Sequence, residues 1–242
     1  ALAMNAKGLE RAIATGRFET TGIISLTASE KFLLRNQKRT LAQNLEAQHN
    51  MIALYKQHNV TIDRGSIMAA FGCNFEGDIS IERVLQMCKQ IFDLAAEYDL
   101  NIKTLALADT MAWATPLSLK RVVGAVRDKY PEQRLSLHLH DTRGMALALA
   151  YAGMEMGVDM YDSCVAGLGG CPFAAHSGAA GNICTEDLVF MCDEMGVETG
   201  VNLEKLLDVA RLAEDIVGHT LPGQVMRGGS LRALRERARA AA

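Results

Sequence analysis

The chain has 242 residues, 49% of them hydrophobic, and a formal net charge of −3. This length fits one α/β barrel or one large two-layer domain rather than two independent domains. No stretch approaches the roughly 20 uninterrupted apolar residues of a transmembrane helix. The acidic and basic residues are interspersed and form no basic stripe suited to a nucleic-acid backbone. The composition therefore argues against a membrane protein and against a nucleic-acid-binding protein.

The six cysteines are spread along the chain and resemble neither a dense disulfide framework nor a paired zinc motif. A reducing compartment is the simpler interpretation. The N-terminus, ALAMNAKG, shows no basic segment followed by an apolar one, so nothing visible directs secretion and we expect a cytoplasmic protein of bacterial type. The sequence does not begin with methionine, which leaves open that it is a fragment.

Short apolar runs rich in β-forming residues alternate with longer stretches of helical period. This alternation predicts successive βα units and a parallel sheet. Six strands are expected, and each is followed by a turn and a helix-like segment. They span Ala1–Met4, Thr21–Leu26, Thr61–Phe71, Thr104–Ala108, Leu135–His140 and Met160–Ala166.

Local signals predict where several helices begin and end. Thr115 and Pro116 offer an N-cap hydroxyl and a proline at the first helical position, and Pro131 stops the helix that follows. Gly157 is expected to end the ALALAYAGMEMG helix, and Gly196 the helix containing LVFMCDEM, because a left-handed residue is least costly as glycine.

Two Asp-Thr pairs, at Asp109 and Asp141, each follow a strand and lie 32 residues apart, about one βα unit. Such units build either an open doubly wound sheet or a closed barrel. The sequence contains neither GxGxxG after the first strand nor a phosphate-binding GxxxxGK[ST] loop. A closed barrel is therefore favoured, with its chemistry at the carboxyl ends of the strands.

His138 and His140 are two positions apart on a predicted strand, so both project from the same face. Imidazoles there suit a divalent transition metal, and neighbouring carboxylates and carboxamides would admit Mg²⁺ or Mn²⁺. The alternative is a pair of histidines on a half-exposed strand, satisfied by solvent and neighbours.

Three further residues have a functional and a structural interpretation. Cys171 lies in the glycine-rich segment VAGLGGCPFAAHSGAAGN, which either delivers a thiol to a site or is an ordinary loop with an inert cysteine. Asn182 either supplies a ligand oxygen or caps the next helix. The Asp109 carboxylate either holds a substrate hydroxyl, orients a histidine or acts as a base, or it accepts a hydrogen bond from the backbone of its own turn.

Taken together, LADTMAWATP, LHLHDTRG, VAGLGGCPFA and GNICTEDLVFM, in this order and spacing, resemble the hydroxymethylglutaryl-CoA (HMG-CoA) lyase family. The resemblance extends from NAKGLERAI to VNLEKLLDVA and includes the family's signature around its cysteine, GLGGCP. It implies an α/β fold of the TIM (β/α)₈ barrel type within the DRE-TIM metallolyase superfamily. It also implies that His138, His140 and Asn182 ligate Mg²⁺ or Mn²⁺, that Cys171 is catalytic, and that Asp109 and Thr110 line the acyl pocket.

The reaction implied by this resemblance is the carbon–carbon cleavage of (S)-3-hydroxy-3-methylglutaryl-CoA to acetyl-CoA and acetoacetate, as in leucine degradation and ketone body metabolism. The partner is then an acyl-CoA thioester, and a homodimer is a candidate assembly. A metal would lower the pKa of the substrate hydroxyl, and the Cys171 thiol would take part in protonating the enolate in a water-poor site.

The sequence departs from the family pattern in three places. The family's first two strands, which supply a metal-ligating aspartate, an arginine and a glutamate, have no counterpart, so we expect a barrel over residues 1–226 that lacks its first two βα units, followed by an arginine-rich tail over 227–242. The stretch Ala106–Thr110 reads ALADT where SLGDT is common. The loop between Cys171 and Asn182 is two residues longer than usual.

Three alternatives remain open at this point. A citramalate or isopropylmalate synthase of the same superfamily is disfavoured, because those enzymes follow HxH with Asn-Asp and lack the cysteine. A lyase for a related 3-hydroxy-3-methyl acyl-CoA such as citramalyl-CoA is kept alive by the ALADT change. The third alternative is an inactive barrel fragment, since an open barrel would expose sheet edges.

Overall fold

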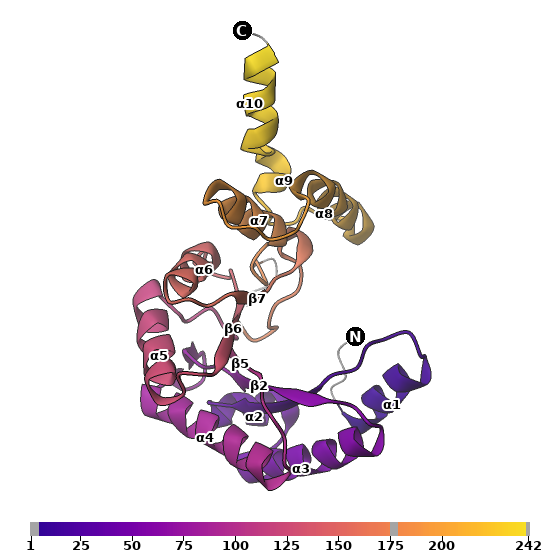
Figure 1. Ribbon diagram of the computed structural model, residues 1–242, viewed down its shortest axis with the longest axis vertical. Coiled ribbons are helices and arrows are strands. Elements are labelled where there is room, and N and C mark those ends of the chain that lie inside the picture. Colours follow the sequence, from indigo (N-terminus) through magenta and orange to yellow (C-terminus); the bar gives the residue numbers. More distant parts are fainter. Residues whose placement is uncertain (1–4, 175–178, 241–242) are drawn as a thin grey trace.

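A curved, five-stranded parallel sheet forms the centre of the molecule (Figure 1). The computed structural model describes residues 5–174 and 179–240. The sheet order is β1-β2-β5-β6-β7, and every neighbouring pair is parallel. The strands span Gly22–Thr27 (β1), Ile62–Met68 (β2), Thr104–Asp109 (β5), Arg134–Leu139 (β6) and Met160–Asp162 (β7). A two-stranded antiparallel ribbon, Gly72–Cys73 (β3) with Gly77–Asp78 (β4), follows β2.

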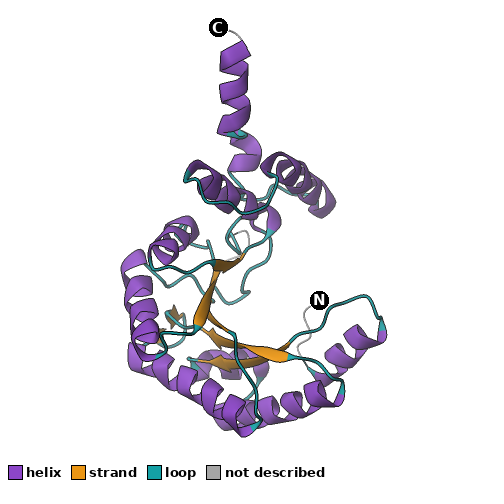
Figure 2. Ribbon diagram, in the orientation of Figure 1, coloured by secondary structure: helices purple, strands orange, loops and turns teal. Residues whose placement is uncertain are grey.

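Helices follow the strands and cover the outer, convex side of the sheet, while its inner side remains open (Figure 2). They span Ala6–Ala14 (α1), Glu30–Gln37 (α2), Leu41–Gln57 (α3), Ile81–Glu97 (α4), Pro116–Lys129 (α5) and Ala146–Glu155 (α6). This is the βα alternation that the sequence predicts.

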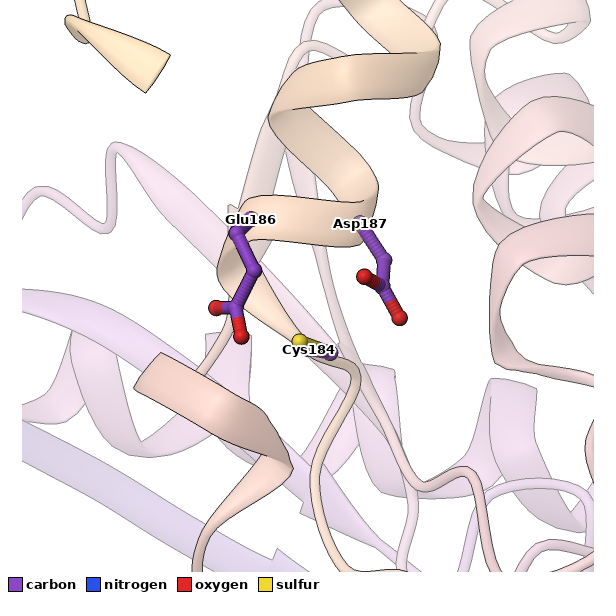
Figure 3. Close-up of side chains that lie close together, drawn as sticks. All are labelled: Cys184, Glu186 and Asp187. Carbon is purple, nitrogen blue, oxygen red and sulfur yellow. The ribbon is translucent and has the colours of Figure 1, made fainter. Parts of the chain in front are cut away.

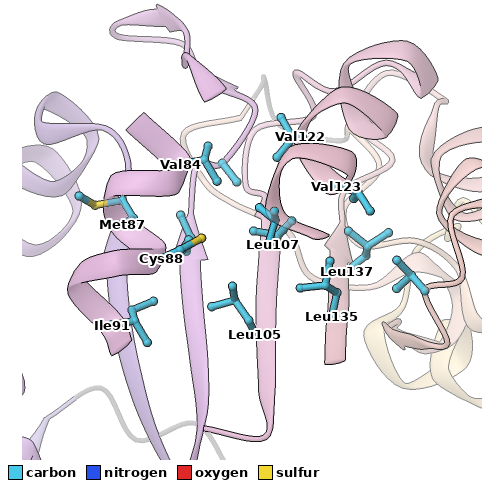
Figure 4. Close-up of a cluster of buried hydrophobic side chains, with 14 of the residues drawn as sticks. Val84, Met87, Cys88, Ile91, Leu105, Leu107, Val122, Val123, Leu135 and Leu137 are labelled. Atoms are coloured by element: carbon cyan, nitrogen blue, oxygen red, sulfur yellow. The ribbon is translucent and has the colours of Figure 1, made fainter. Parts of the chain in front are cut away.

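The main core lies between the sheet and these helices. On β5 and β6, alternate leucines point outward and are almost completely buried, because successive side chains of a strand face opposite sides. Figure 4 shows four of them, Leu105, Leu107, Leu135 and Leu137, against apolar side chains of α4 and α5. The residues that alternate with the leucines on β6, Ser136 and His138, face the inner side of the sheet.

The helix boundaries agree with the local signals. Thr115 caps α5 by accepting from the Ser118 amide, and Pro116 is its first residue. Gly157 and Gly196 lie just after α6 and after α7 (Thr185–Glu194), at φ +75° and +73°. These are left-handed positions that glycine adopts at least cost. The sequence prediction of these helix ends is confirmed.

Closure of the sheet differs from the sequence prediction. No closed barrel forms within residues 5–174 and 179–240; the five strands make an open arc. Two predicted strands are shorter, because the backbone turns left-handed at Ala69 after β2 and the 3₁₀ turn Val165–Gly167 (η1) follows β7. The predicted strand Ala1–Met4 lies outside the described residues.

The free edge of β1 is partly covered by α3. The Ser25 amide donates to Gln48 Oε1 (2.9 Å), and Asn44 Nδ2 donates to the Ser25 carbonyl (3.4 Å). Both α3 side chains are buried. Polar side chains thus satisfy backbone groups that an adjacent strand would otherwise pair.

The C-terminal part is helical. α7 is followed by Leu203–Val217 (α8), Val225–Gly228 (α9) and Leu231–Ala240 (α10), and α10 points away from the sheet in Figure 1. A second apolar cluster joins α7, α8 and α9. The predicted boundary at residue 227 falls inside α9, and the arginine-rich tail forms α10. Among the helices described, none combines the length and apolar character needed to cross a membrane.

Candidate metal and thiol site

His138 and His140 lie at the carboxyl end of β6, where the sheet presents its loops. Their Nε2 atoms are 3.2 Å apart, so both imidazoles are directed at one point. His140 is 4% exposed, whereas His138 is half-buried. The same-face arrangement predicted from their spacing is what the structure shows.

Asp162, at the end of the neighbouring strand β7, fixes the His138 ring. Its Oδ2 lies 3.2 Å from His138 Nδ1, and the two residues are register partners. The hydrogen bond to His138 lowers the Asp162 pKa, against the effect of burial. When His138 Nδ1–H donates to the Asp162 carboxylate, the free lone pair of the ring lies on Nε2. This is the arrangement that a metal-binding histidine needs.

His140 stays neutral near physiological pH. Burial, together with the charge of His138, lowers its pKa to about 4, and the Thr110 carbonyl and the Asn182 side chain only partly oppose this. Its buried Nδ1 makes no hydrogen bond to any residue that the structure describes. A neutral imidazole keeps the free lone pair that metal binding requires.

Asn182 is brought beside His140 by a short antiparallel pairing of the two residues. The Ile183 amide donates to the Leu139 carbonyl (2.9 Å), and the Asp141 amide donates to the Gly181 carbonyl (2.7 Å). Asn182 Nδ2 donates to the Leu168 carbonyl (2.8 Å), which leaves Oδ1 for another partner. The structure therefore brings together all three residues predicted as ligands.

These donors fit a divalent cation. At metal–nitrogen distances of about 2.1 Å, two donors at right angles are separated by about 3.0 Å, and two tetrahedral donors by about 3.4 Å. The 3.2 Å between the two Nε2 atoms lies within this range. Two imidazoles and one amide oxygen suit Mn²⁺ better than the harder Mg²⁺.

Cys171 lies on the loop Leu168–Ala174, which packs directly on the segment that carries Asn182. A Cβ on Gly181 would lie 1.7 Å from the Gly169 carbonyl oxygen, and one on Gly170 would lie 2.8 Å from Gly181 Cα. Only glycines permit so close an approach of two backbones. The Cys171 thiol is half-buried, and burial raises its pKa although the Phe173 and Ala174 amides oppose the shift.

The predicted pocket residues Asp109 and Thr110 lie beneath these loops and bond to backbone groups. Asp109 is 1% exposed and accepts from the amides of Trp113 (2.7 Å) and Ala114 (3.1 Å). Burial raises its pKa to about 6, against those bonds and the charges of Arg143 and His138. Thr110 Oγ1 accepts from the Ala69 amide (2.8 Å). Their contact with a substrate stays a prediction.

Three alanines with left-handed backbone mark the loops around the site. Ala69, Ala112 and Ala166 each have φ +53°, which costs an alanine about 1 kcal/mol or more. Polar groups hold them in place: Arg143 Nη1 donates to the Ala112 carbonyl (3.2 Å), and the Ala166 amide donates to Glu186 Oε2 (3.0 Å). Left-handed non-glycine residues held by their surroundings are typical of functional loops.

A second group of potential ligands comprises Cys184, Glu186 and Asp187, at the start of α7 (Figure 3). The Asp187 oxygens accept from the amides of Gln224 and Val225, which begin α9. The Ala166 amide donates to Glu186 Oε2, so only Glu186 Oε1 and the Cys184 sulfur remain as possible metal ligands. We therefore regard this group as a structural clamp that anchors α9 and η1 to α7.

Sequence reasoning missed Asp162, Glu186 and Asn74. Asp162 lies inside a predicted strand, and an acidic residue in register with a histidine on the next strand was the available signal. Glu186 bonds to Ala166 and Asn74 to Phe173, both contacts distant in sequence, and no local pattern marks them.

A family model described as HMGL-like matches residues 1–213. The chain belongs to this family. It is 34% identical over 224 residues to the hydroxymethylglutaryl-CoA lyase YngG of Bacillus subtilis and covers 93% of itself and 71% of that protein. It is 38% identical over 207 residues to the mitochondrial hydroxymethylglutaryl-CoA lyase of Homo sapiens, covering 86% and 60%.

A solved relative agrees in fold. An HMG-CoA lyase of Acinetobacter baumannii, in complex with coenzyme A and 3-methylmalate, superposes with a TM-score of 0.81 at 36% identity, over 94% of this chain and 70% of that one. The family predicted from the four motifs is thus confirmed, and the relatives are carbon–carbon lyases. The chain spans about three fifths of the human relative's length.

Proposed function

We propose that this chain carries the metal and thiol half of a carbon–carbon lyase that cleaves (S)-3-hydroxy-3-methylglutaryl-CoA to acetyl-CoA and acetoacetate. The observation that carries the proposal is the meeting of the His138 and His140 Nε2 atoms, with Asn182 paired beside His140 and the Cys171 loop packed against the segment that carries Asn182. The names of the relatives, HMG-CoA lyases at 34–38% identity, support this substrate.

The two histidines and Asn182 would hold a Mg²⁺ or Mn²⁺ ion. Such an ion supplies Lewis-acid polarisation of the substrate's oxygen atoms. Asp162 keeps the His138 lone pair on Nε2. The low pKa of His140 keeps its imidazole neutral, so this ring need not lose a proton to bind.

Cys171 is suited to donate a proton. In the cleavage, the hydroxyl proton leaves, the bond between C2 and C3 breaks, and its electron pair passes to the enolate of acetyl-CoA. Because burial raises the Cys171 pKa, the thiol carries its proton at neutral pH. It transfers that proton to C2, and the resulting thiolate is reprotonated by the released hydroxyl proton through solvent.

A related substrate, citramalyl-CoA, is the second candidate because Ala106 and Ala108 are alanines in the stretch ALADT. Ala106 is a register partner of Ser66 and Ser136, so this layer of the inner side carries small side chains. That layer can accept an acyl group of different shape.

Product analysis tests the proposal. The chain is incubated with Mn²⁺ and either thioester, and acetoacetate or pyruvate is measured beside acetyl-CoA. We expect acetoacetate from the glutaryl substrate, and turnover lower by orders of magnitude in Cys171→Ala than in the control Cys164→Ala. Pyruvate alone would favour the citramalyl substrate, and equal turnover in both variants would remove the role of Cys171.

The third candidate is a chain that binds metal but needs further groups for turnover. The family resemblance implies a further aspartate ligand and an arginine; among the described residues, Asp162 is engaged by His138, and Arg143 by the carbonyls of Met111 and Ala112. In that case Mn²⁺ raises the melting temperature while both thioesters stay intact. Homodimer formation and a cytoplasmic location stay predictions.

A further inference from the structure

Asn74 joins the Cys171 loop to a segment that follows a different strand of the sheet. Asn74 comes directly after the short strand β3, which follows β2, whereas Cys171 comes after β7. Asn74 Nδ2 donates to the carbonyls of Phe173 (2.7 Å) and Ala174 (3.0 Å). One amide group therefore binds two consecutive carbonyls directly after the cysteine and its proline.

The acceptor side of Asn74 is also occupied. The Trp113 indole donates from Nε1 to Asn74 Oδ1 (2.7 Å). The Trp113 backbone amide donates in turn to the buried Asp109 carboxylate (2.7 Å). A continuous chain of hydrogen bonds thus runs from Asp109, inside the sheet end, through Trp113 and Asn74 to the Cys171 loop.

Packing fixes this chain of bonds. The Trp113 ring lies so close to Gly72 that a Cβ there would be 2.7 Å from the ring. The Phe173 ring meets Phe32 and Phe75 edge to face, at centroid distances of 6.1 and 6.0 Å. Cys171 belongs to the same apolar cluster. Edge-to-face contacts of this kind add to the stabilisation from burial.

The loop is therefore held at both ends. At its start, Leu168 accepts from Asn182, and Gly169 and Gly170 touch the backbone of Gly181. At its end, Phe173 and Ala174 are bound by Asn74. Cys171 lies between these two attachments, so its distance from the proposed ligand Asn182 depends on both.

We propose that Asn74, held by Trp113, is the positioning residue that keeps the Cys171 loop closed over the ends of the strands. The inference rests on the proposed function only in giving Cys171 its catalytic role. Asn74 touches no reacting atom; it acts by holding the two carbonyls that follow the cysteine.

The test measures alkylation of each cysteine by iodoacetamide, resolved by mass spectrometry, on the whole chain at constant pH. In Asn74→Asp the acceptor for Trp113 remains and the two donated bonds are lost. We expect Cys171 to react about tenfold faster, the factor that corresponds to about 1.4 kcal/mol. Cys164, which is also partly exposed, serves as the internal reference and keeps its rate. Asn50→Asp, on the exposed side of α3, is the matched control.

A second variant covers the case in which Asn74→Asp is unstable. Trp113→Phe keeps an aromatic ring at this position and removes the Nε1 donor together with part of the ring system, so Cys171 should react severalfold faster with Cys73 and Cys88 still protected. The melting shift caused by Mn²⁺ should persist in both variants, because neither touches a proposed ligand. Unchanged Cys171 rates in both folded variants would overturn the proposal.

The outcome is independent of lyase turnover. Faster alkylation with no cleavage of either thioester supports the positioning role of Asn74 and counts against the proposed function. Cleavage with unchanged alkylation supports the proposed function and counts against the role of Asn74. Where cleavage occurs, loss of kcat at constant KM in Asn74→Asp, with recovery in Asn74→Gln, is the result expected of a positioning residue.

Discussion

Replacement of Gly181 by alanine should disturb the site more than adding a methyl group to any other glycine whose surroundings the structure describes. The new Cβ would lie 1.7 Å from the Gly169 carbonyl oxygen, 2.4 Å from its carbon and 3.0 Å from the Gly170 nitrogen. Carbon and oxygen atoms in contact are normally separated by more than 3 Å, so one of two backbones must move by over 1 Å. Neither neighbour is a flexible side chain that can turn away.

The expected cost follows from overpacking, about 1–3 kcal/mol. In a chain of this size each kcal/mol lowers the melting temperature by about 2–4 °C, so a loss of about 2–12 °C is expected. Gly124→Ala is the control. A Cβ there would meet only Met156 Cε, at 3.8 Å, within the helix α5. Alanine in a helix interior gains about 0.5–1 kcal/mol over glycine, so this variant should melt about 1–4 °C higher.

Calorimetry with and without millimolar Mn²⁺ measures both effects. Because Gly181 precedes Asn182, displacement of the loop should also weaken the metal-dependent shift in Gly181→Ala and leave it intact in Gly124→Ala. Melting of Gly181→Ala within 1 °C of the parent chain, with an unchanged Mn²⁺ shift, would refute the close packing of the glycine loop on this segment.

Three further predictions address separate parts of the molecule. Asp162→Asn should weaken Mn²⁺ binding about 10-fold to 100-fold, as measured by the melting shift, because His138 loses its charged partner; Asp159→Asn, which breaks a surface ion pair, is the control and should bind normally. Thr115→Ala removes the cap of α5 and should cost about 1 kcal/mol in a denaturant titration, and an unchanged midpoint would count against the cap. The alkylation rate of Cys171 should rise with pH through a midpoint above the usual value of about 8.5, because burial raises the thiol pKa and only the thiolate reacts; a midpoint below that value contradicts the burial.

Local chemistry made much of the fold predictable. Alternating leucines on β5 and β6 fix which side faces the helices, and this same alternation sends His138 and His140 to the inner side. Thr115 and Gly157 mark helix ends by hydrogen bonding and by backbone freedom, which neighbouring residues alone decide. These features depend on short stretches of sequence, so a pattern can reveal them.

Features that depend on distant segments were not predictable in this way. The open arc depends on which strands pair with one another, and strand pairing joins distant parts of the sequence. The hydrogen bond from Ser25 on β1 to Gln48 likewise depends on where α3 packs. Asn182 was predicted as a ligand from the family resemblance, but its pairing with His140 depends on the path of a long loop. Asn74 and Trp113 are separated from Cys171 by more than 50 residues; Trp113 lies in the motif LADTMAWATP, but nothing in that motif marks its hydrogen bond to Asn74, and Asn74 falls in no motif.

The charge of the described ligands limits how tightly this site can bind. His140 is neutral and Asn182 is an amide, and nearby carboxylates are engaged: Asp162 by His138, and Asp109 by the amides of Trp113 and Ala114. Hard divalent cations are usually held by carboxylates, and affinity falls with the number of charged ligands; the weakest Ca²⁺ sites bind at about 10⁻⁴–10⁻³ M. We therefore expect the melting temperature to begin rising only at roughly millimolar Mn²⁺, and to rise less with Mg²⁺, because imidazole favours the softer ion. A rise that already begins at low micromolar Mn²⁺ would refute a ligand set made of two imidazoles and an amide alone, since an added carboxylate would then be needed to account for the affinity.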